Sequence, residues 1–147
     1  GVGARGSSGV AGVVKSTPGA LTYVDVAYSL ANKFTFATIK NRAGKFATPG
    51  LRGIQAAVSK LPAKITELSQ LKIVDPPAQA GPLAYPIVTF TYVIVPTNAG
   101  KSADLRKFVY WAVTQGQAFG KPLLFQPLPK PVQAFAYREI KKIGSAT

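Results

Sequence analysis

The stretch from Asp75 to Pro82, with the sequence DPPAQAGP, most constrains how this 147-residue chain can fold. Proline lacks the backbone donor that helices and central strands need, and glycine permits positive φ. We therefore expect no long helix or strand to continue through this stretch. A stiff, turn-rich connection of this kind is the best candidate boundary in the chain. It predicts two parts, residues 1–82 and residues 83–147.

Short helices and strands are expected to alternate in the first part. Ser7 or Ser8 is expected to cap a helix that ends at residues 17–19 (TPG), because proline and glycine interrupt helices there. Residues 20–24 predict a short buried strand, and Asp25 is expected to cap a helical turn after it.

A hairpin and a further helix are expected next in the chain. Residues 34–40 alternate as in a strand, and a turn over residues 41–44 leads to a return strand over residues 45–47. An amphipathic helix is predicted after the hairpin. Its apolar stripe comprises Leu51, Ile54, Val58 and Leu61.

The second part is expected to combine one strong strand with two longer helices. Residues 86–95 are rich in Val, Ile, Thr and aromatic residues and are apolar on both faces, which is typical of a strand inside a sheet. Ser102 or Asp104 is expected to cap a helix that runs to Phe119. After a Pro-rich crossing, Pro131 suits the first turn of a last helix. These elements predict the α/β class.

The composition argues against an enzyme. The chain has no histidine and no cysteine, so it offers no imidazole base, thiol nucleophile, disulfide or thiolate zinc site. The spacing of its acids suggests neither a carboxylate dyad nor an oxygen-ligand metal loop. We therefore expect no catalytic residues, no metal site and no cofactor. The five acids are Asp25, Glu67, Asp75, Asp104 and Glu139.

The formal net charge of +13 predicts attraction to anions. The 18 Lys and Arg residues are spread along the chain rather than gathered in one cluster. Nucleic-acid-binding modules concentrate positive charge on one face and interleave stacking aromatics. A solvated basic surface is thus favoured over a nucleic-acid interface, and a stand-alone protein that binds polyanions stays open as an alternative.

No apolar run approaches the roughly 20 residues that span a bilayer, and no signal-peptide pattern opens the chain. We expect a soluble, globular protein.

Two glycine-containing motifs resemble phosphate-binding loops. Residues 1–6 fit G-x-G-x-x-G, but the strand that a dinucleotide fingerprint needs before it is not there. Val95 stands where a P-loop ending at residues 100–102 (GKS) needs glycine. The first motif can be a tight turn or, with a helix N-terminus beside it, an anion site.

Five segments together resemble the C-terminal half of the phosphate-binding proteins that serve phosphate ABC transporters. Their shared order along the chain carries the resemblance, although Leu21 and Thr22 depart from the family's TPGAIGYV segment. The resemblance extends to about Ile143. The segments are residues 3–10 (GARGSSGV), 17–24 (TPGALTYV), 85–87 (YPI), 108–112 (FVYWA) and 127–129 (PLP).

The resemblance implies a two-lobed periplasmic-binding-protein fold, with residues 1–82 in the second lobe and residues 83–147 returning to the first. In this family a Ser-Gly-Thr loop, an Arg, an Asp and first-lobe hydroxyls hold phosphate, and all lie upstream of the matching segment. Within this sequence, the resemblance makes Arg5, Gly6, Ser7 and Ser8 the candidate residues near phosphate. Exposed sheet edges and half-covered cores are therefore expected, as is a partner in the form of a missing N-terminal half or companion chain.

The same resemblance implies function and location. It predicts a role as scaffold and hinge in phosphate uptake, with an ABC transporter permease as partner. It also implies a periplasmic or extracellular location, with an anchor in the upstream part. An assembly protein that pairs through exposed sheet edges is a further alternative.

Overall fold

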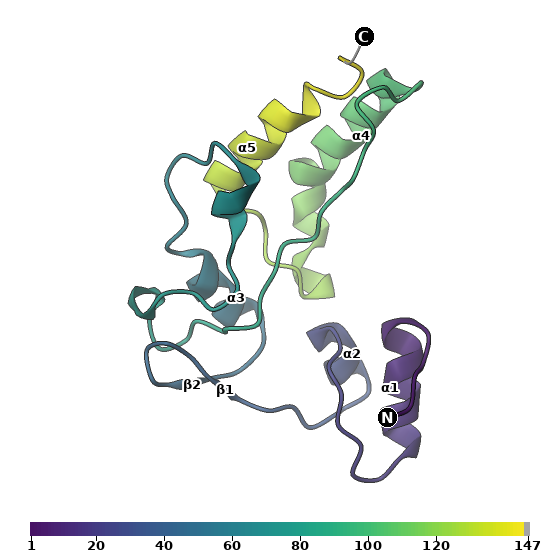
Figure 1. Ribbon diagram of the computed structural model, residues 1–147, viewed down its shortest axis with the longest axis vertical. Helices are drawn as coiled ribbons and strands as arrows, with labels where there is room; N and C mark the ends of the chain where they lie inside the picture. The colour runs from purple at the N-terminus through teal and green to yellow at the C-terminus, as the bar shows by residue number, and fades with distance from the viewer. Residues whose placement is uncertain (146–147) are drawn as a thin grey trace. The chain divides into compact units, whose positions relative to one another are not determined.

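The computed structural model describes residues 1–145 and divides the chain into two compact units (Figure 1). Unit 1 is Gly1–Thr38, and unit 2 begins at Ile39. Each unit is defined by the contacts within it. The predicted boundary between two lobes at residue 82 is a different boundary and stays a prediction. Within residues 75–82 the longest regular element is the short 3₁₀ helix η2 (Ala78–Ala80), so the stretch interrupts the regular structure as expected.

Unit 1 contains two helices in contact, α1 (Gly6–Ser16) and α2 (Val26–Ala31). The helix expected in this region is confirmed, and it ends at the TPG segment. The predicted caps are wrong, because Arg5 occupies the N-cap position and no side chain caps the first amides. Asp25 does precede α2, but its backbone carbonyl, not its carboxylate, accepts the N–H groups of Tyr28 and Ser29.

The strand predicted over residues 20–24 is wrong. The segment forms no ladder within residues 1–145, and the side chains of Leu21 and Tyr23 are 96% and 94% exposed. A strand, unlike a helix, obtains its backbone hydrogen bonds from another segment. High β-propensity alone therefore does not produce a strand when no neighbour lies alongside.

Unit 2 begins with the expected hairpin. Strand β1 (Ile39–Lys40) pairs antiparallel with β2 (Phe46–Ala47), with Ile39 opposite Ala47. The pairing covers only the end of the strand predicted over residues 34–40. These two strands form the one sheet in the part of the chain that the structure describes, so the expected α/β content is realised as a helix-rich fold with a small sheet.

Asn41 fixes the hairpin to a distant loop. Its side chain is buried, and its Nδ2 donates to the carbonyl oxygens of Pro82 and Ala84 at 3.0 Å each. Its Oδ1 accepts the backbone N–H of Lys45 at 3.1 Å. One amide thus satisfies backbone groups from two segments about forty residues apart in sequence.

Helix α3 (Leu51–Val58) packs its predicted stripe into a core formed by Ala57, Ile73 and Val88. The loop that carries Tyr85 approaches this helix at Gly53. A Cβ atom on Gly53 would lie 2.9 Å from both the Thr48 carbonyl oxygen and the Tyr85 Cβ. Burial of Tyr85 raises the pKa of its hydroxyl. Glycine is required here by close approach rather than by an unusual φ.

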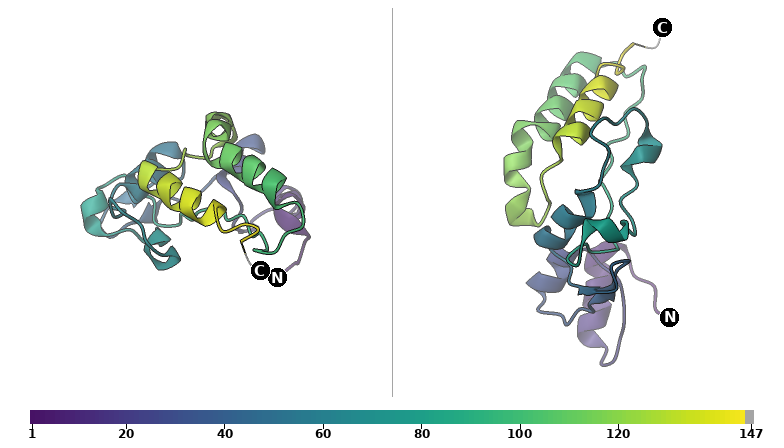
Figure 2. Two further views of the ribbon diagram at one scale, coloured as in Figure 1. Left: turned by 90° about the horizontal axis from the view of Figure 1, so that it is seen from above. Right: turned by 90° about the vertical axis from the view of Figure 1, so that its left-hand side faces the viewer.

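Helices α4 (Ser102–Val113) and α5 (Lys130–Ile140) lie side by side (Figures 1 and 2). They enclose a core of Val109, Ile140 and Ile143, and Arg106 donates to the Ile143 carbonyl oxygen at 2.9 Å. Pro131 lies in the first turn of α5, as predicted.

The helix predicted from residue 102 to Phe119 is partly wrong. It ends at Val113, and neither Ser102 nor Asp104 is its N-cap, since Lys101 holds that position. The chain then continues in shorter 3₁₀ turns. Residues 39–145 contain four such turns: η1 (Leu68–Leu71), η2, η3 (Gln115–Phe119) and η4 (Lys121–Leu123).

A third core joins α5 to the loop before η1. Val132 and Phe135 of α5 pack against Ile65 and Leu71, and Arg138 donates to the Ile65 carbonyl oxygen. None of the helices within residues 1–145 is long and apolar enough to cross a membrane.

The prediction of a strand over residues 86–95 is wrong for the described residues. This segment is extended but has no strand partner within the described residues, and Ile94 is 94% exposed. The reason is the same as for residues 20–24: a strand needs a neighbouring strand.

Replacing Asn41 with alanine tests the hairpin anchor. Asn41→Ala leaves buried carbonyl groups without a donor, so we expect it to lower the free energy of unfolding by about 1–3 kcal/mol. Asn98→Ala, in an exposed turn, is the matched control and should change it by less than about 0.5 kcal/mol. Urea unfolding measures both, and equal effects would contradict the anchoring role.

The close approach at Gly53 gives a second stability test. Gly53→Ala should cost about 1–3 kcal/mol, because the added methyl group meets two neighbours at 2.9 Å. Gly100→Ala is the control, since nothing lies within 4 Å of a Cβ at that position. Thermal unfolding should show a lower Tm for Gly53→Ala alone, and an unchanged Tm would show that the loop does not pack closely on α3.

Candidate anion site at the start of helix α1

The N-terminal end of α1 brings together the four residues predicted to lie near phosphate. Arg5 is the N-cap residue, Gly6 is the first helical residue, and Ser7 and Ser8 follow in the first turn. Arg5, Gly6 and Ser8 are exposed, and Ser7 is half-buried. Gly6 has a φ of 66°, in the region that favours glycine. The local fold thus gathers these residues at one helix end.

The electrostatics of this end favour an anion. The first N–H groups of a helix have no partner within the helix, and the helix dipole adds partial positive charge there. No side chain caps these groups, and the first turn contains no acidic residue. The Arg5 guanidinium adds a full positive charge at the same end. Negative groups such as phosphate or sulfate are the natural ligands of such an arrangement.

The same end lacks what a selective phosphate site needs. Hydrogen phosphate carries a proton that must be accepted, whereas sulfate carries none at neutral pH, so a carboxylate acceptor separates the two ions. None of the four residues has a carboxylate. The sequence also contains no Ser-Gly-Thr. This helix end can attract an anion, and it has no group that distinguishes phosphate.

The start of α3 in unit 2 is chemically similar to the start of α1. The sequence analysis did not identify this second helix start as a candidate anion site. Gly50 is the N-cap with positive φ, the first turn has no acid, and Arg52 lines a shallow hollow of about 320 Å³. The signal in the sequence was the run PGLRG at residues 49–53, where glycine and arginine open a helix. Arg52 is therefore a useful control for Arg5.

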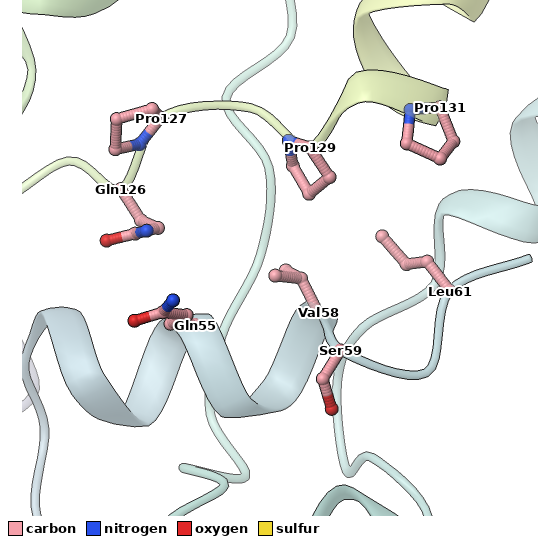
Figure 3. Close-up of a pocket in the computed structure, with 8 residues that line it drawn as sticks. All are labelled: Gln55, Val58, Ser59, Leu61, Gln126, Pro127, Pro129 and Pro131. Carbon is pink, nitrogen blue, oxygen red and sulfur yellow. The ribbon is translucent and has the colours of Figure 1, made fainter. Parts of the chain in front are cut away.

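A second hollow in unit 2 is an open groove of about 420 Å³ between α3 and the Pro-rich segment that precedes α5 (Figure 3). The side-chain amides of Gln55 and Gln126 face each other across it in Figure 3. The rest of the lining is mostly apolar, and no charged side chain contributes, so this groove is not an anion site. The other lining residues are Val58, Ser59, Leu61, Pro127, Pro129 and Pro131.

Comparison with known proteins identifies the family. The family described as "PBP superfamily domain" matches residues 1–115. The phosphate-binding protein PstS of Methanocaldococcus jannaschii is 34% identical over an alignment of 130 positions that covers 80% of this chain and 33% of that protein. PstS of Xylella fastidiosa strain Temecula1 is 31% identical over an alignment of 149 positions that covers 96% of this chain and 40% of that protein. PstS of Pasteurella multocida is 26% identical over an alignment of 136 positions.

The chain therefore belongs to the PBP superfamily, whose members have a periplasmic-binding-protein-like fold. The resemblance to phosphate-binding proteins, seen first in five short segments, is confirmed by these relatives. The chain spans about 33–40% of the length of these curated relatives.

Proposed function

We propose that this chain forms part of a solute-binding protein for inorganic phosphate that serves an ABC transporter. The observation that carries the proposal is the similarity to three proteins named PstS, at 26–34% identity over most of the chain. Those relatives are named phosphate-binding proteins, which supports a binding role rather than an enzymatic one. The composition, without histidine or cysteine, supports the same conclusion.

The chain is proposed to supply scaffold and hinge rather than the main ligand contacts. The start of α1 is open and has no carboxylate, which supports placing the groups that select phosphate in polypeptide outside this sequence. Residues 75–82, at the proposed lobe boundary, contain no regular element longer than the 3₁₀ helix η2, which suits a hinge there. Residues 1–82 and 83–147 are proposed to belong to the second and first lobes.

Arg5, Gly6, Ser7 and Ser8 are proposed to lie near the bound phosphate. Their positive charge and free helix amides support this placement, because both favour an anion. The net charge of +13 acts at longer range by attracting anions toward the protein.

The proposed location is outside the cytoplasm, and the proposed partner is the permease of the transporter. Similarity to PstS proteins of bacteria and an archaeon supports both points. Attachment to the membrane, where it occurs, is assigned to polypeptide upstream of this sequence.

A second candidate function is binding of a polyanion. The charge of +13 favours it, as does the finding of only two ion pairs within residues 1–145, Arg42–Asp75 and Lys142–Glu139. Steep loss of binding with salt and no preference among anions would identify this function.

A chimera tests the phosphate role. The stretch of M. jannaschii PstS that matches this chain would be replaced by the aligned part of this chain. We expect the chimera to bind phosphate and to prefer it over sulfate, measured by calorimetry at matched ionic strength. The control is M. jannaschii PstS without that stretch, which should not bind. A folded chimera that binds neither anion selectively would contradict the proposed function.

The same chimera tests the helix α1 site. Arg5→Ala should weaken phosphate binding about tenfold, because one charge-assisted contact is lost. Arg52→Ala removes the same charge at the start of α3 and should change binding less than about twofold. Equal losses would show that only the overall charge matters and would remove Arg5 from the site.

A further inference from the structure

Helices α4 and α5 of unit 2 lie side by side and run in opposite directions (Figure 2). Arg106, near the start of α4, donates to the carbonyl oxygen of Ile143, just after α5. At the other end of the pair, Gln133 of α5 donates to the carbonyl oxygen of Val113, the last residue of α4. The start of α4 therefore lies beside the end of α5.

This packing gathers basic residues that are far apart in the sequence. Residues 101–107 and 138–142 together contain six basic residues and two acids. One of the acids, Glu139, already pairs with Lys142 at 2.7 Å. The helix pair therefore ends in a cluster with net positive charge, which the spread of charges along the sequence does not reveal.

Two tyrosines extend this cluster along an exposed face of the helix pair. The rings of Tyr110 on α4 and Tyr137 on α5 meet edge to face, with centroids 5.7 Å apart, and the two residues are 42% and 45% exposed. Lys107 lies one turn before Tyr110 on the same side of α4. Lys141 lies one turn after Tyr137, and its Nζ is 4.6 Å from the centroid of that ring. These four residues are called the Tyr–Lys face below.

The chemistry of the Tyr–Lys face fits the surface of an anionic membrane. Tyrosine is enriched at the headgroup level of bilayers, where its ring meets apolar surface and its hydroxyl meets water. Lysine ammonium groups are attracted to anionic headgroups, and their alkyl stems cover apolar surface. None of the four side chains is acidic. The net charge of +13 adds attraction to an anionic surface at longer range.

The same geometry disfavours nucleic acid as the partner. Single-stranded nucleic acid stacks its bases on free aromatic faces. Here the ammonium group of Lys141 lies over the Tyr137 ring, and Tyr110 packs against the same ring at an interplanar angle of 64°. A duplex is read by an element that enters a groove, whereas this face spans two adjacent helices. A flat layer of headgroups suits such a face better.

We propose that the Tyr–Lys face binds the phosphate-containing headgroups of an anionic lipid bilayer. The lysines would contact the headgroup phosphates, and the tyrosine pair would lie at the level of the headgroups. This inference goes beyond the proposed function, because it concerns the surface on which the protein rests and not the solute that it binds.

Co-sedimentation of the 147-residue chain with lipid vesicles tests the proposal. We expect binding to vesicles of phosphatidylcholine mixed with anionic phosphatidylglycerol. Binding to vesicles of phosphatidylcholine alone should be at least about tenfold weaker, because the electrostatic attraction is lost. Equal binding to both vesicles would show that exposed apolar surface alone causes adsorption, and would overturn the proposal.

Two lysine variants locate the charge that matters. Lys107→Gln combined with Lys141→Gln should weaken binding to anionic vesicles about 30-fold, since each basic residue near an anionic surface contributes roughly a factor of five. The control combines Lys45→Gln with Lys60→Gln, which removes the same charge from exposed positions outside α4 and α5. It should weaken binding less than about threefold. Equal losses would leave only the overall charge as the cause and would overturn the proposal.

The tyrosines have a matched test of their own. Tyr110→Ser removes one ring of the pair and should weaken binding to anionic vesicles about fivefold, because the ring no longer reaches the headgroup layer. Tyr23→Ser, at a position in unit 1 that is 94% exposed, should change binding less than about twofold. Circular dichroism checks that each variant retains its helices. Equal effects of the two substitutions would contradict a role for the tyrosine pair.

Two competitors distinguish the lipid surface from other anions. Inorganic phosphate, compared with chloride at matched ionic strength, should not displace the chain from anionic vesicles, and selective displacement would make free phosphate the ligand of this face. Duplex DNA should bind the Lys107 and Lys141 double variant about as well as it binds the control variant. A selective loss of DNA binding would assign the face to nucleic acid. Either result would overturn the proposal.

The vesicle measurements are independent of the proposed function. A chain that binds anionic vesicles through the Tyr–Lys face, while the chimera with M. jannaschii PstS fails to prefer phosphate, would contradict the proposed function alone. A chimera that prefers phosphate, while the chain ignores anionic vesicles, would contradict the membrane proposal alone.

Discussion

The rest of the structure depends on where backbone hydrogen-bonding groups find partners. A helix satisfies its own groups, so α1, α3, α4 and α5 form within this chain. A strand relies on a second segment, and only the hairpin brings two strand segments together among the described residues. Asn41 supplies partners in the interior in the same way, because its one buried amide donates to the carbonyl groups of Pro82 and Ala84 and accepts the N–H of Lys45. Helices and side-chain anchors therefore define what this chain can build.

Much of the local structure could be predicted from the sequence. The stripe at Ile54 and Val58, the turn after β1 and the proline at the start of α5 each depend on neighbouring residues, which the sequence shows directly. The strands over residues 20–24 and 86–95 could not be predicted in the same way, because their formation depends on a partner that no local pattern reveals. The predicted caps were wrong for a different reason. Ser7, Ser8 and Ser102 have suitable side chains, but the helices begin one to three residues earlier than capping by them requires.

The candidate site shows a similar limit. Glycine, arginine and serine before an apolar stripe predicted a helix start that suits an anion, and the structure places Arg5 and Gly6 at that start. The comparable start of α3, with Gly50 and Arg52, escaped notice because its sequence was interpreted only as a helix stripe. Family membership was recognisable from five short segments in order, although none of them contains the Ser-Gly-Thr loop of the family. Phosphate selectivity needs groups that converge from several segments, and residue patterns within one segment cannot establish them.

The central claim is that this chain belongs to a phosphate receptor but does not by itself hold the groups that select phosphate. Calorimetric titration of phosphate into the purified 147-residue chain, with sulfate as control at matched ionic strength, tests it most directly. The account predicts at most weak heats that are the same for the two anions and decline with salt, as expected for an open helix end on a basic protein. Saturable binding that prefers phosphate over sulfate would contradict it and would place a complete site within these residues.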